Sequence, residues 1–167
     1  PLETVGQRLD IQTDQSGPGW SSIGVSEDFP LEGARSLYGA TKLASELLLT
    51  EYGEMYRLRT ITNRCGVLTG PWQMGKMDQG FVVLWAARHL YGGPLAYIGF
   101  DGHGHQVRDI LHVIDLYNLL RHQLEHIDIA NGQIFNVGGG QGTSASLAEL
   151  TSLCEKYSGN QLDIGID

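Results

Sequence analysis

The chain has 167 residues and a formal net charge of −8, with 41% hydrophobic and 18% charged residues. This length suits one compact domain or part of a larger one, and the composition excludes a disordered chain. The acidic balance, with no cluster of lysine and arginine, excludes nucleic acid as a partner. The longest apolar run, Phe81 to Ala87, is too short to cross a bilayer, so we expect no membrane segment, and we see no secretory signal.

The two cysteines indicate a reducing compartment. Cys65 and Cys154 lie far apart and match neither a disulfide framework nor a zinc-binding pattern. We therefore expect two small buried side chains in a cytoplasmic protein.

Glycine is frequent, with 23 residues, and often follows apolar runs. Glycine at the ends of apolar runs is typical of α/β proteins in which tight turns follow the strands and lie near a ligand.

The first part of the chain predicts a long connection, then a helix and a strand. Residues 1–35 carry few periodic apolar positions and include a Ser-Gly-Pro-Gly turn, so we expect irregular structure there. From Ser36 to Tyr56, apolar residues recur at steps of three and four, which predicts an amphipathic helix. The β-branched segment Arg59 to Cys65 predicts a buried strand.

Helices and strands alternate over the rest of the chain, and this order favours parallel strands in an α/β layer structure. Ser146 and Glu149 form a capping box that begins the last helix, and Gly159 ends it. The other expected elements are helices over Gly80 to Tyr91 and Val113 to His126, and strands over Leu95 to Ile98 and Gln133 to Val137.

The motif with the most specific chemistry begins the predicted long helix. Tyr38 and Lys42 are four residues apart, so they share one helical face. A free phenol has a pKa of about 10 and is a poor base at neutral pH, but a nearby ammonium favours the phenolate. The pair can therefore exchange a proton with a sugar or steroid hydroxyl. Taken alone, this spacing is common, and a solvated helix face also explains it.

Further motifs accompany Tyr38-Gly-Ala-Thr-Lys-Leu-Ala-Ser-Glu in a fixed order. They are Arg64-Cys-Gly-Val-Leu-Thr-Gly-Pro71, Gln106-Val-Arg-Asp-Ile-Leu-His-Val113 and Phe135-Asn-Val-Gly-Gly139. From about Glu27 onward, the chain closely resembles the extended short-chain dehydrogenase/reductase family, the nucleotide-sugar epimerases and dehydratases. The resemblance implies an α/β fold, with the C-terminal part of a Rossmann-type parallel sheet and a small substrate-binding region.

The resemblance also implies an NAD cofactor. Tyr38 would be the catalytic acid and base, and Lys42 would bind the nicotinamide ribose and favour the phenolate. The segment Arg64 to Leu68 would run beside the nicotinamide and the substrate. Many family members have asparagine where this chain has Val67, so contacts to the substrate are expected to differ there. The residues implied on the cofactor side are Tyr38, Lys42, Arg64, Cys65, Gly66 and Val67.

On the substrate side, the resemblance implies a nucleotide-diphosphate sugar, linked to CDP or UDP. Arg108 would bind the diphosphate, which suits the planar fork of a guanidinium. Ala96 and Ile98 would flank the nucleotide base, and Gln79 and Gly80 would contact the nucleotide end of the substrate.

Other side chains have simpler explanations. Asp109, His112 and Asp115 match the family pattern, but they are expected to organise a turn and cap the following helix. His103 and His105 have no third ligand at a fixed spacing, so we expect surface histidines and no metal.

The family binds NAD(P) through a Gly-x-x-Gly-x-x-Gly turn, which does not occur in residues 1–167, and its Ser/Thr upstream of the catalytic tyrosine is also not found. We therefore expect residues 1–167 to be the C-terminal portion of such an enzyme, a portion that alone neither binds NAD tightly nor turns over. Such a portion would lack the first strands of the sheet, and a sheet edge and apolar faces would then be exposed.

Within the family, Asn63 to Gly75 together with Asp78-Gln79-Gly80 is most similar to the CDP-paratose (CDP-tyvelose) 2-epimerases. The expected reaction of the parent enzyme is inversion at C2 of CDP-paratose through a transient keto-sugar. A UDP-sugar 4-epimerase, a nucleotide-sugar 4,6-dehydratase and a non-catalytic nucleotide-sugar-binding protein are the alternatives. A homodimer or higher homo-oligomer is expected, with Leu43, Leu47 and Tyr52 available for its interface or for burial within one subunit.

Overall fold

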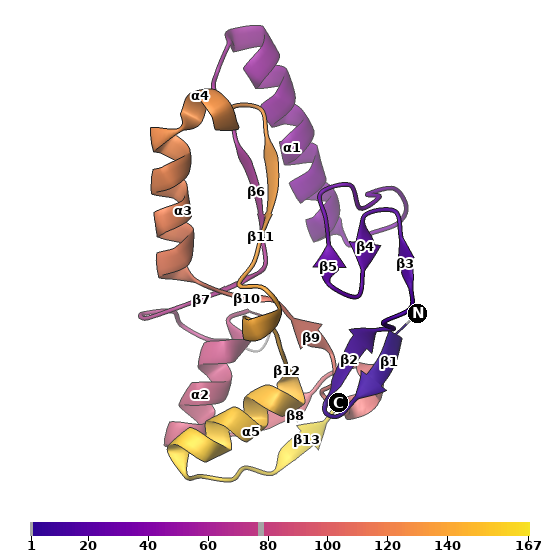
Figure 1. Ribbon diagram of the computed structural model, residues 1–167. Coiled ribbons are helices and arrows are strands. Elements are labelled where there is room, and N and C mark those ends of the chain that lie inside the picture. Colours follow the sequence, from indigo (N-terminus) through magenta and orange to yellow (C-terminus); the bar gives the residue numbers. More distant parts are fainter. Residues whose placement is uncertain (1, 77–78) are drawn as a thin grey trace.

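The computed structural model describes residues 2–76 and 79–167. Helices alternate with short strands from Leu37 onward, and three pairs of strands run parallel (Figure 1). This arrangement confirms the predicted α/β fold with parallel strands. The parallel pairs are β6 (Thr62–Cys65) with β11 (Ile134–Val137), β7 (Val67–Thr69) with β10 (Ile110–His112), and β8 (Leu95–Tyr97) with β13 (Ile164–Ile166).

The predicted helices form where their capping signals place them. Ser36 caps α1, because its side chain accepts a hydrogen bond from the backbone N of Gly39 at 3.1 Å. The capping box of Ser146 and Glu149 is present, and Gly159 ends the last helix in the left-handed conformation, with φ 74°. The helices are α1 (Leu37–Tyr56), α2 (Phe81–Tyr91), α3 (Val113–Glu125), α4 (Ile127–Ala130) and α5 (Leu147–Ser158), with 3-10 turns at Phe100–Gly102 and Gln141–Thr143.

The prediction of a long irregular connection over residues 1–35 is wrong for residues 2–25, which contain five short strands. A hairpin forms first, and a small three-stranded antiparallel sheet follows it (Figure 1). These strands are two to four residues long and reverse at tight turns such as the one at Gly6, with φ 60°, so they leave almost no periodic pattern. The hairpin pairs β1 (Leu2–Val5) with β2 (Arg8–Ile11), and the sheet contains β3 (Ser16–Gly17), β4 (Trp20–Ser21) and β5 (Gly24–Val25).

The hydrophobic core lies where α2 and α5 pack against β8 and β13. Its buried members are Leu84, Trp85, Leu95 and Leu150. Trp85 donates from Nε1 to the Thr151 hydroxyl at 2.8 Å, so the polar edge of the indole is satisfied inside the core. This unit supports β9 (Val107–Arg108), which pairs antiparallel with β12 (Ala145–Ser146).

The apolar face of the long helix α1 is largely exposed. No residue of α1 is buried, and Leu37 and Leu47 are 87% and 64% exposed. A cavity of about 380 Å³ lies between α1, β6 and β11. Among the residues that the structure describes, β11 is the only strand that pairs with β6. The exposed apolar face and the open edge of β6 both agree with the sequence expectation.

Both cysteines are free thiols, as expected, but their burial was overestimated. Cys65 is exposed and Cys154 is half-buried, because β6 ends at Cys65 beside an open cavity. Partial burial raises the pKa of both thiols. Within the described residues, no helix combines the length and apolar character needed to cross a membrane.

We predict that Ser146→Ala destabilises the chain more than Ser36→Ala. The Ser146 side chain is fully buried; it accepts from Glu149 N at 3.0 Å and donates to the carbonyl of Gln7 at 2.6 Å. Its loss removes a helix cap and leaves the Gln7 carbonyl without this donor, so we expect a cost of about 2 kcal/mol. The exposed cap at Ser36 is expected to cost about 0.5–1 kcal/mol. Urea unfolding of both variants measures the difference; equal values would contradict the prediction.

Candidate functional site

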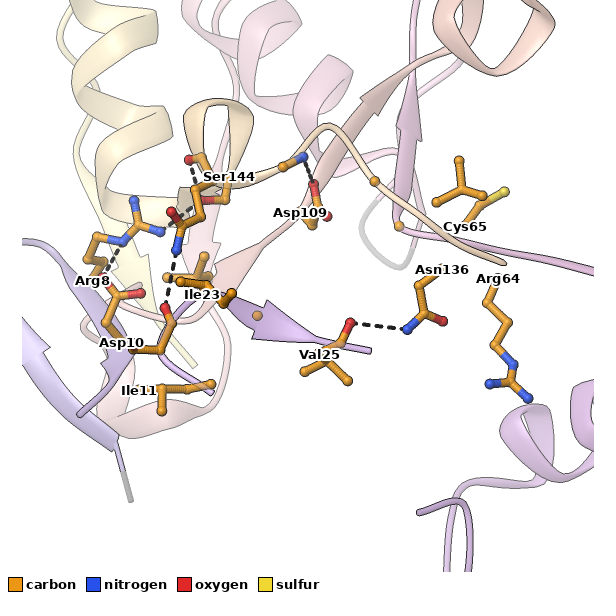
Figure 2. Close-up of a pocket in the computed structure, with 18 residues that line it drawn as sticks. Arg8, Asp10, Ile11, Ile23, Val25, Arg64, Cys65, Asp109, Asn136 and Ser144 are labelled. Atoms are coloured by element: carbon orange, nitrogen blue, oxygen red, sulfur yellow. Dashed lines mark hydrogen bonds and ion pairs between the residues drawn. The ribbon is translucent and has the colours of Figure 1, made fainter. Parts of the chain in front are cut away.

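A large cavity lies between the N-terminal hairpin, β5 and the ends of β6 and β11 (Figure 2). Its volume is about 660 Å³. Cys65 and Val137, which end the parallel strands β6 and β11, both line it. In open α/β sheets, ligands bind outside the carboxyl ends of parallel strands, so this position favours a binding site.

One wall of this cavity is a glycine-rich turn fixed by a carboxylate. The Asp109 side chain accepts hydrogen bonds from the backbone N of Gly139 at 2.8 Å and of Gly140 at 3.1 Å. The carbonyl of Asp109 also accepts from Val67 N at 2.8 Å. His112 caps α3, with its Nδ1 3.2 Å from Ile114 N. The expectation that Asp109 and His112 organise a turn and cap a helix is therefore confirmed.

Arg8 forms the opposite wall, and the sequence reasoning did not identify it. Its guanidinium lies 2.9 Å from a carboxylate oxygen of Asp10 and donates to the Ser144 hydroxyl at 2.8 Å (Figure 2). Glu149 contributes a second carboxylate at 3.6 Å. These partners hold the hairpin against the start of α5. Because residues 1–35 carry no periodic pattern, no signal in the sequence placed Arg8 at a site.

Only part of the predicted cofactor-side segment, residues 64–67, lines this cavity. Arg64, Cys65 and Gly66 line the cavity, whereas Val67 does not. Arg64 is held by Glu46 of α1, at 3.0 Å and 2.7 Å for its Nε and one terminal nitrogen. These hydrogen bonds raise the pKa of the Arg64 guanidinium. Arg64 therefore fixes α1 to β6.

Glu27 is a further residue that sequence reasoning missed. Its carboxylate accepts from the backbone N of Asn136 at 2.6 Å, and this hydrogen bond lowers the pKa of Glu27. The Asn136 side chain donates to the carbonyl of Val25 at 3.1 Å (Figure 2). The two contacts tie β5 to β11 across the cavity.

A smaller cavity, of about 240 Å³, is lined by most of the predicted substrate-side residues. Gln79, Ala96, Ile98 and Arg108 all line it, although they come from three separate segments. Gly80 does not line it but caps α2 in the left-handed conformation, with φ 68°. Of the Asp78-Gln79-Gly80 motif, Asp78 lies outside the described residues.

Strand β9 separates the two cavities. Val107 and Asp109 line the larger cavity, whereas Gln106 and Arg108 line the smaller one. This division follows from the two-residue alternation of an extended chain, which directs successive side chains to opposite faces. One short strand therefore serves both cavities.

Tyr38 and Lys42 lie on one face of α1, as their spacing predicts. The Lys42 Nζ is 5.3 Å from the centre of the Tyr38 ring, and both residues are exposed, Tyr38 at 70%. Neither lines the two cavities described above. The geometry therefore keeps the pair together and open, but the described residues do not enclose it.

The chain belongs to the NAD dependent epimerase/dehydratase family, whose model matches residues 16–138. The enzymes of this family act with NAD. The matched range contains the pair on α1 and all of the predicted site residues, but the cavity lining also includes residues before 16 and after 138.

Particular relatives have different activities. The chain is 32% identical to CDP-paratose 2-epimerase of Salmonella typhi over 73% of its own length and 37% of that protein. It is 31% identical to UDP-glucose 4-epimerase of Azospirillum brasilense over 84% of its length and 43% of that protein. Among solved structures, dTDP-glucose 4,6-dehydratase of Bacillus anthracis in complex with NAD is 25% identical, with a TM-score of 0.69, over 84% of this chain and 43% of that one.

These matches confirm the Rossmann-type fold class expected from the sequence. The chain spans about two fifths of the length of the curated relatives it matches, with 37% and 43% covered in the two cases above.

We predict that Gly139→Ala destabilises the turn beside the large cavity and that Gly142→Ala does not. A Cβ at residue 139 would collide with the Ile110 carbonyl and the Thr143 hydroxyl, whereas one at residue 142 meets no atom within 4 Å. Neither glycine has a positive φ, so the contrast is purely steric. We expect a loss of about 1–3 kcal/mol for Gly139→Ala and a change within about 0.5 kcal/mol for Gly142→Ala. Urea unfolding provides the measurement, and comparable losses in both variants would refute the steric argument.

Proposed function

We propose that the whole protein is an NAD-dependent epimerase or dehydratase that acts on a nucleotide-diphosphate sugar. The observation that carries this proposal is the convergence of Gln79, Ala96, Ile98 and Arg108 on one cavity, next to a larger one at the strand ends. The resemblance of the sequence to the nucleotide-sugar epimerases and dehydratases predicts these four residues as substrate contacts. The proposed activity also agrees with the family match.

The exposed pair on α1 has the chemistry to receive the nicotinamide ribose. Tyr38 offers a phenol and Lys42 an ammonium, and within residues 2–76 and 79–167 neither side-chain polar group has an ion pair or hydrogen bond. A ribose presents two hydroxyls that such groups can bind, so the residues present fit this part of NAD. When bound, NAD accepts a hydride from the substrate and returns it.

The roles of the protein groups follow from their chemistry. Tyr38 Oη removes the proton of the reacting sugar hydroxyl and later returns it, while the Lys42 ammonium stabilises the phenolate. Arg108 binds the diphosphate, since a guanidinium offers paired donors to phosphate oxygens. The base would lie against Ala96 and Ile98 in the smaller cavity, and the sugar would lie across β9 toward Cys65 and Gly66.

CDP-paratose is the substrate that we favour, with inversion at C2 to give CDP-tyvelose. The support is the similarity to the Salmonella typhi enzyme and to its group over Asn63 to Gly75. The similarity to a UDP-glucose 4-epimerase and to a dTDP-glucose 4,6-dehydratase is nearly as high. Product analysis with CDP-, UDP- and dTDP-sugars separates these three activities.

A second candidate is a non-catalytic nucleotide-sugar-binding protein, because Tyr38 is 70% exposed and lines neither cavity.

We also propose that residues 1–167 are the C-terminal portion of an enzyme. This enzyme would form a homo-oligomer in the cytoplasm. The exposed apolar stripe of α1 supports an interface between subunits.

We predict that Tyr38→Phe in the whole protein lowers kcat by about 10²–10⁴-fold, because it removes the group that transfers the proton. The ring beside Lys42 is retained, so binding of the nucleotide sugar should change little. Tyr52→Phe is the matched control, since Tyr52 is an exposed tyrosine of the same helix that stacks on Tyr56. Unchanged turnover in Tyr38→Phe would exclude this proton-transfer role, whereas nucleotide-sugar binding without product formation by the unaltered protein would favour the second candidate.

Arg108→Gln is predicted to raise KM for the nucleotide sugar by about 10- to 100-fold, with a smaller effect on kcat. The reason is the loss of charge-assisted hydrogen bonds to the diphosphate, which form in both the ground state and the transition state. Arg59→Gln removes another exposed charge, one that pairs with Asp128, and it should leave KM unchanged. Steady-state kinetics over a range of substrate concentrations provides the comparison, and equal KM values for both variants would exclude Arg108 from the diphosphate site.

A further inference from the structure

Three side chains of types that can bind metal ions gather on the last turn of α3, outside the set of predicted site residues. His122, Glu125 and His126 are all exposed, and one ligand atom of each lies within 4.8 Å of the others. None of them lines either cavity. We propose that these three residues form a binding site for a divalent transition-metal ion of the zinc class.

The spacing along the helix accounts for this arrangement. His122 and His126 are four residues apart and share one face, with their ring centres 4.3 Å apart. Ligand atoms bound tetrahedrally to Zn²⁺ at about 2.0–2.1 Å are about 3.4 Å from one another. The three side chains therefore need to approach by at most about 1.5 Å, and their exposure allows this through small rotations.

A hydrogen bond to the backbone prepares His126 for coordination. Its Nδ1 lies 3.0 Å from the carbonyl oxygen of His122. A carbonyl only accepts, so Nδ1 carries the proton in this contact and the neutral ring presents its lone pair at Nε2. A histidine whose other ring nitrogen donates to a backbone carbonyl is the usual arrangement around bound metals.

The electrostatic surroundings favour a cation. The carbonyl groups at the end of α3 give this turn partial negative charge, and Glu125 adds a formal one. Arg121 opposes binding, because its guanidinium lies 3.5 Å from the Glu125 carboxylate and repels a dication. Arg121 therefore competes with the metal for the Glu125 carboxylate.

The ligand set determines the class of metal. Two imidazoles and one carboxylate suit Zn²⁺ and its transition-metal neighbours, whereas Ca²⁺ and Mg²⁺ prefer sites made of oxygen. Three protein ligands leave further positions to water. His126 also separates α3 from α4, so a bound ion fixes the junction between these helices.

Calorimetric titration of the metal-free whole protein with Zn²⁺ tests the proposal. We expect saturable binding, weakened at least about tenfold by His122→Asn and by His126→Asn, because each variant removes one ligand. The matched control is the double variant His103→Asn/His105→Asn, which removes another adjacent pair of histidine rings, 5.5 Å apart, and should leave this binding unchanged. Binding that survives His122→Asn, or the absence of saturable binding, would overturn the proposal.

Two further variants distinguish coordination from simple attraction of charge. Glu125→Gln should weaken Zn²⁺ binding, whereas Arg121→Gln should strengthen it a few-fold, since it frees the carboxylate. Ni²⁺ should broaden the amide NMR signals of residues 121–127 at substoichiometric amounts, and Mg²⁺ should leave them unchanged. Equal responses to Ni²⁺ and Mg²⁺ would show ion-atmosphere binding and contradict a coordination site. All of these readouts are independent of turnover, so they do not depend on the proposed function.

Discussion

The site depends on Asp109, which joins three segments that are distant in sequence. Its carboxylate holds Gly139 and Gly140 of the turn after β11, and its carbonyl holds Val67 at the start of β7. Gly66 must be glycine here, because a Cβ would lie 2.7 Å from that same carbonyl oxygen. The neighbouring residue, Arg108, lines the smaller cavity. One residue therefore sets the distance between the strand ends at the large cavity and the guanidinium assigned to the diphosphate.

The two halves of the fold are packed differently around this point. The unit of α2, α5, β8 and β13 contains the buried core, where Trp85 and Tyr97 both hydrogen-bond to the Thr151 hydroxyl at 2.8 Å. Helix α1 is attached by Arg64 and Glu46 over a cavity and buries none of its own residues. The cavity with the proposed substrate-side residues is lined in part by this densely packed unit, whereas the proposed proton-transfer pair lies on the loosely packed helix. This difference is consistent with precise binding of the nucleotide and adjustable placement of Tyr38.

Much of the fold could be predicted because the helices carry local signals. Ser36, Ser146 and Gly159 begin or end helices through contacts within a few residues, so their roles are visible in sequence. The hairpin containing Arg8 was missed because its stability comes from contacts with Ser144 and Glu149, more than a hundred residues away. The cavity with Arg108 was anticipated only through resemblance to a family. Neither its shape nor the exposure of Tyr38 follows from periodicity, because both depend on which elements cover them.

The alternation along β9 constrains how this site can change during evolution. Successive residues face different cavities, so a substitution at Arg108 alters one cavity and a substitution at Val107 alters the other. The two binding preferences can therefore diverge independently through point changes. Insertion or deletion of one residue would exchange every side chain between the cavities at once. Sequence length between Gln106 and Asp109 is thus expected to be invariant among relatives that differ widely in base and sugar.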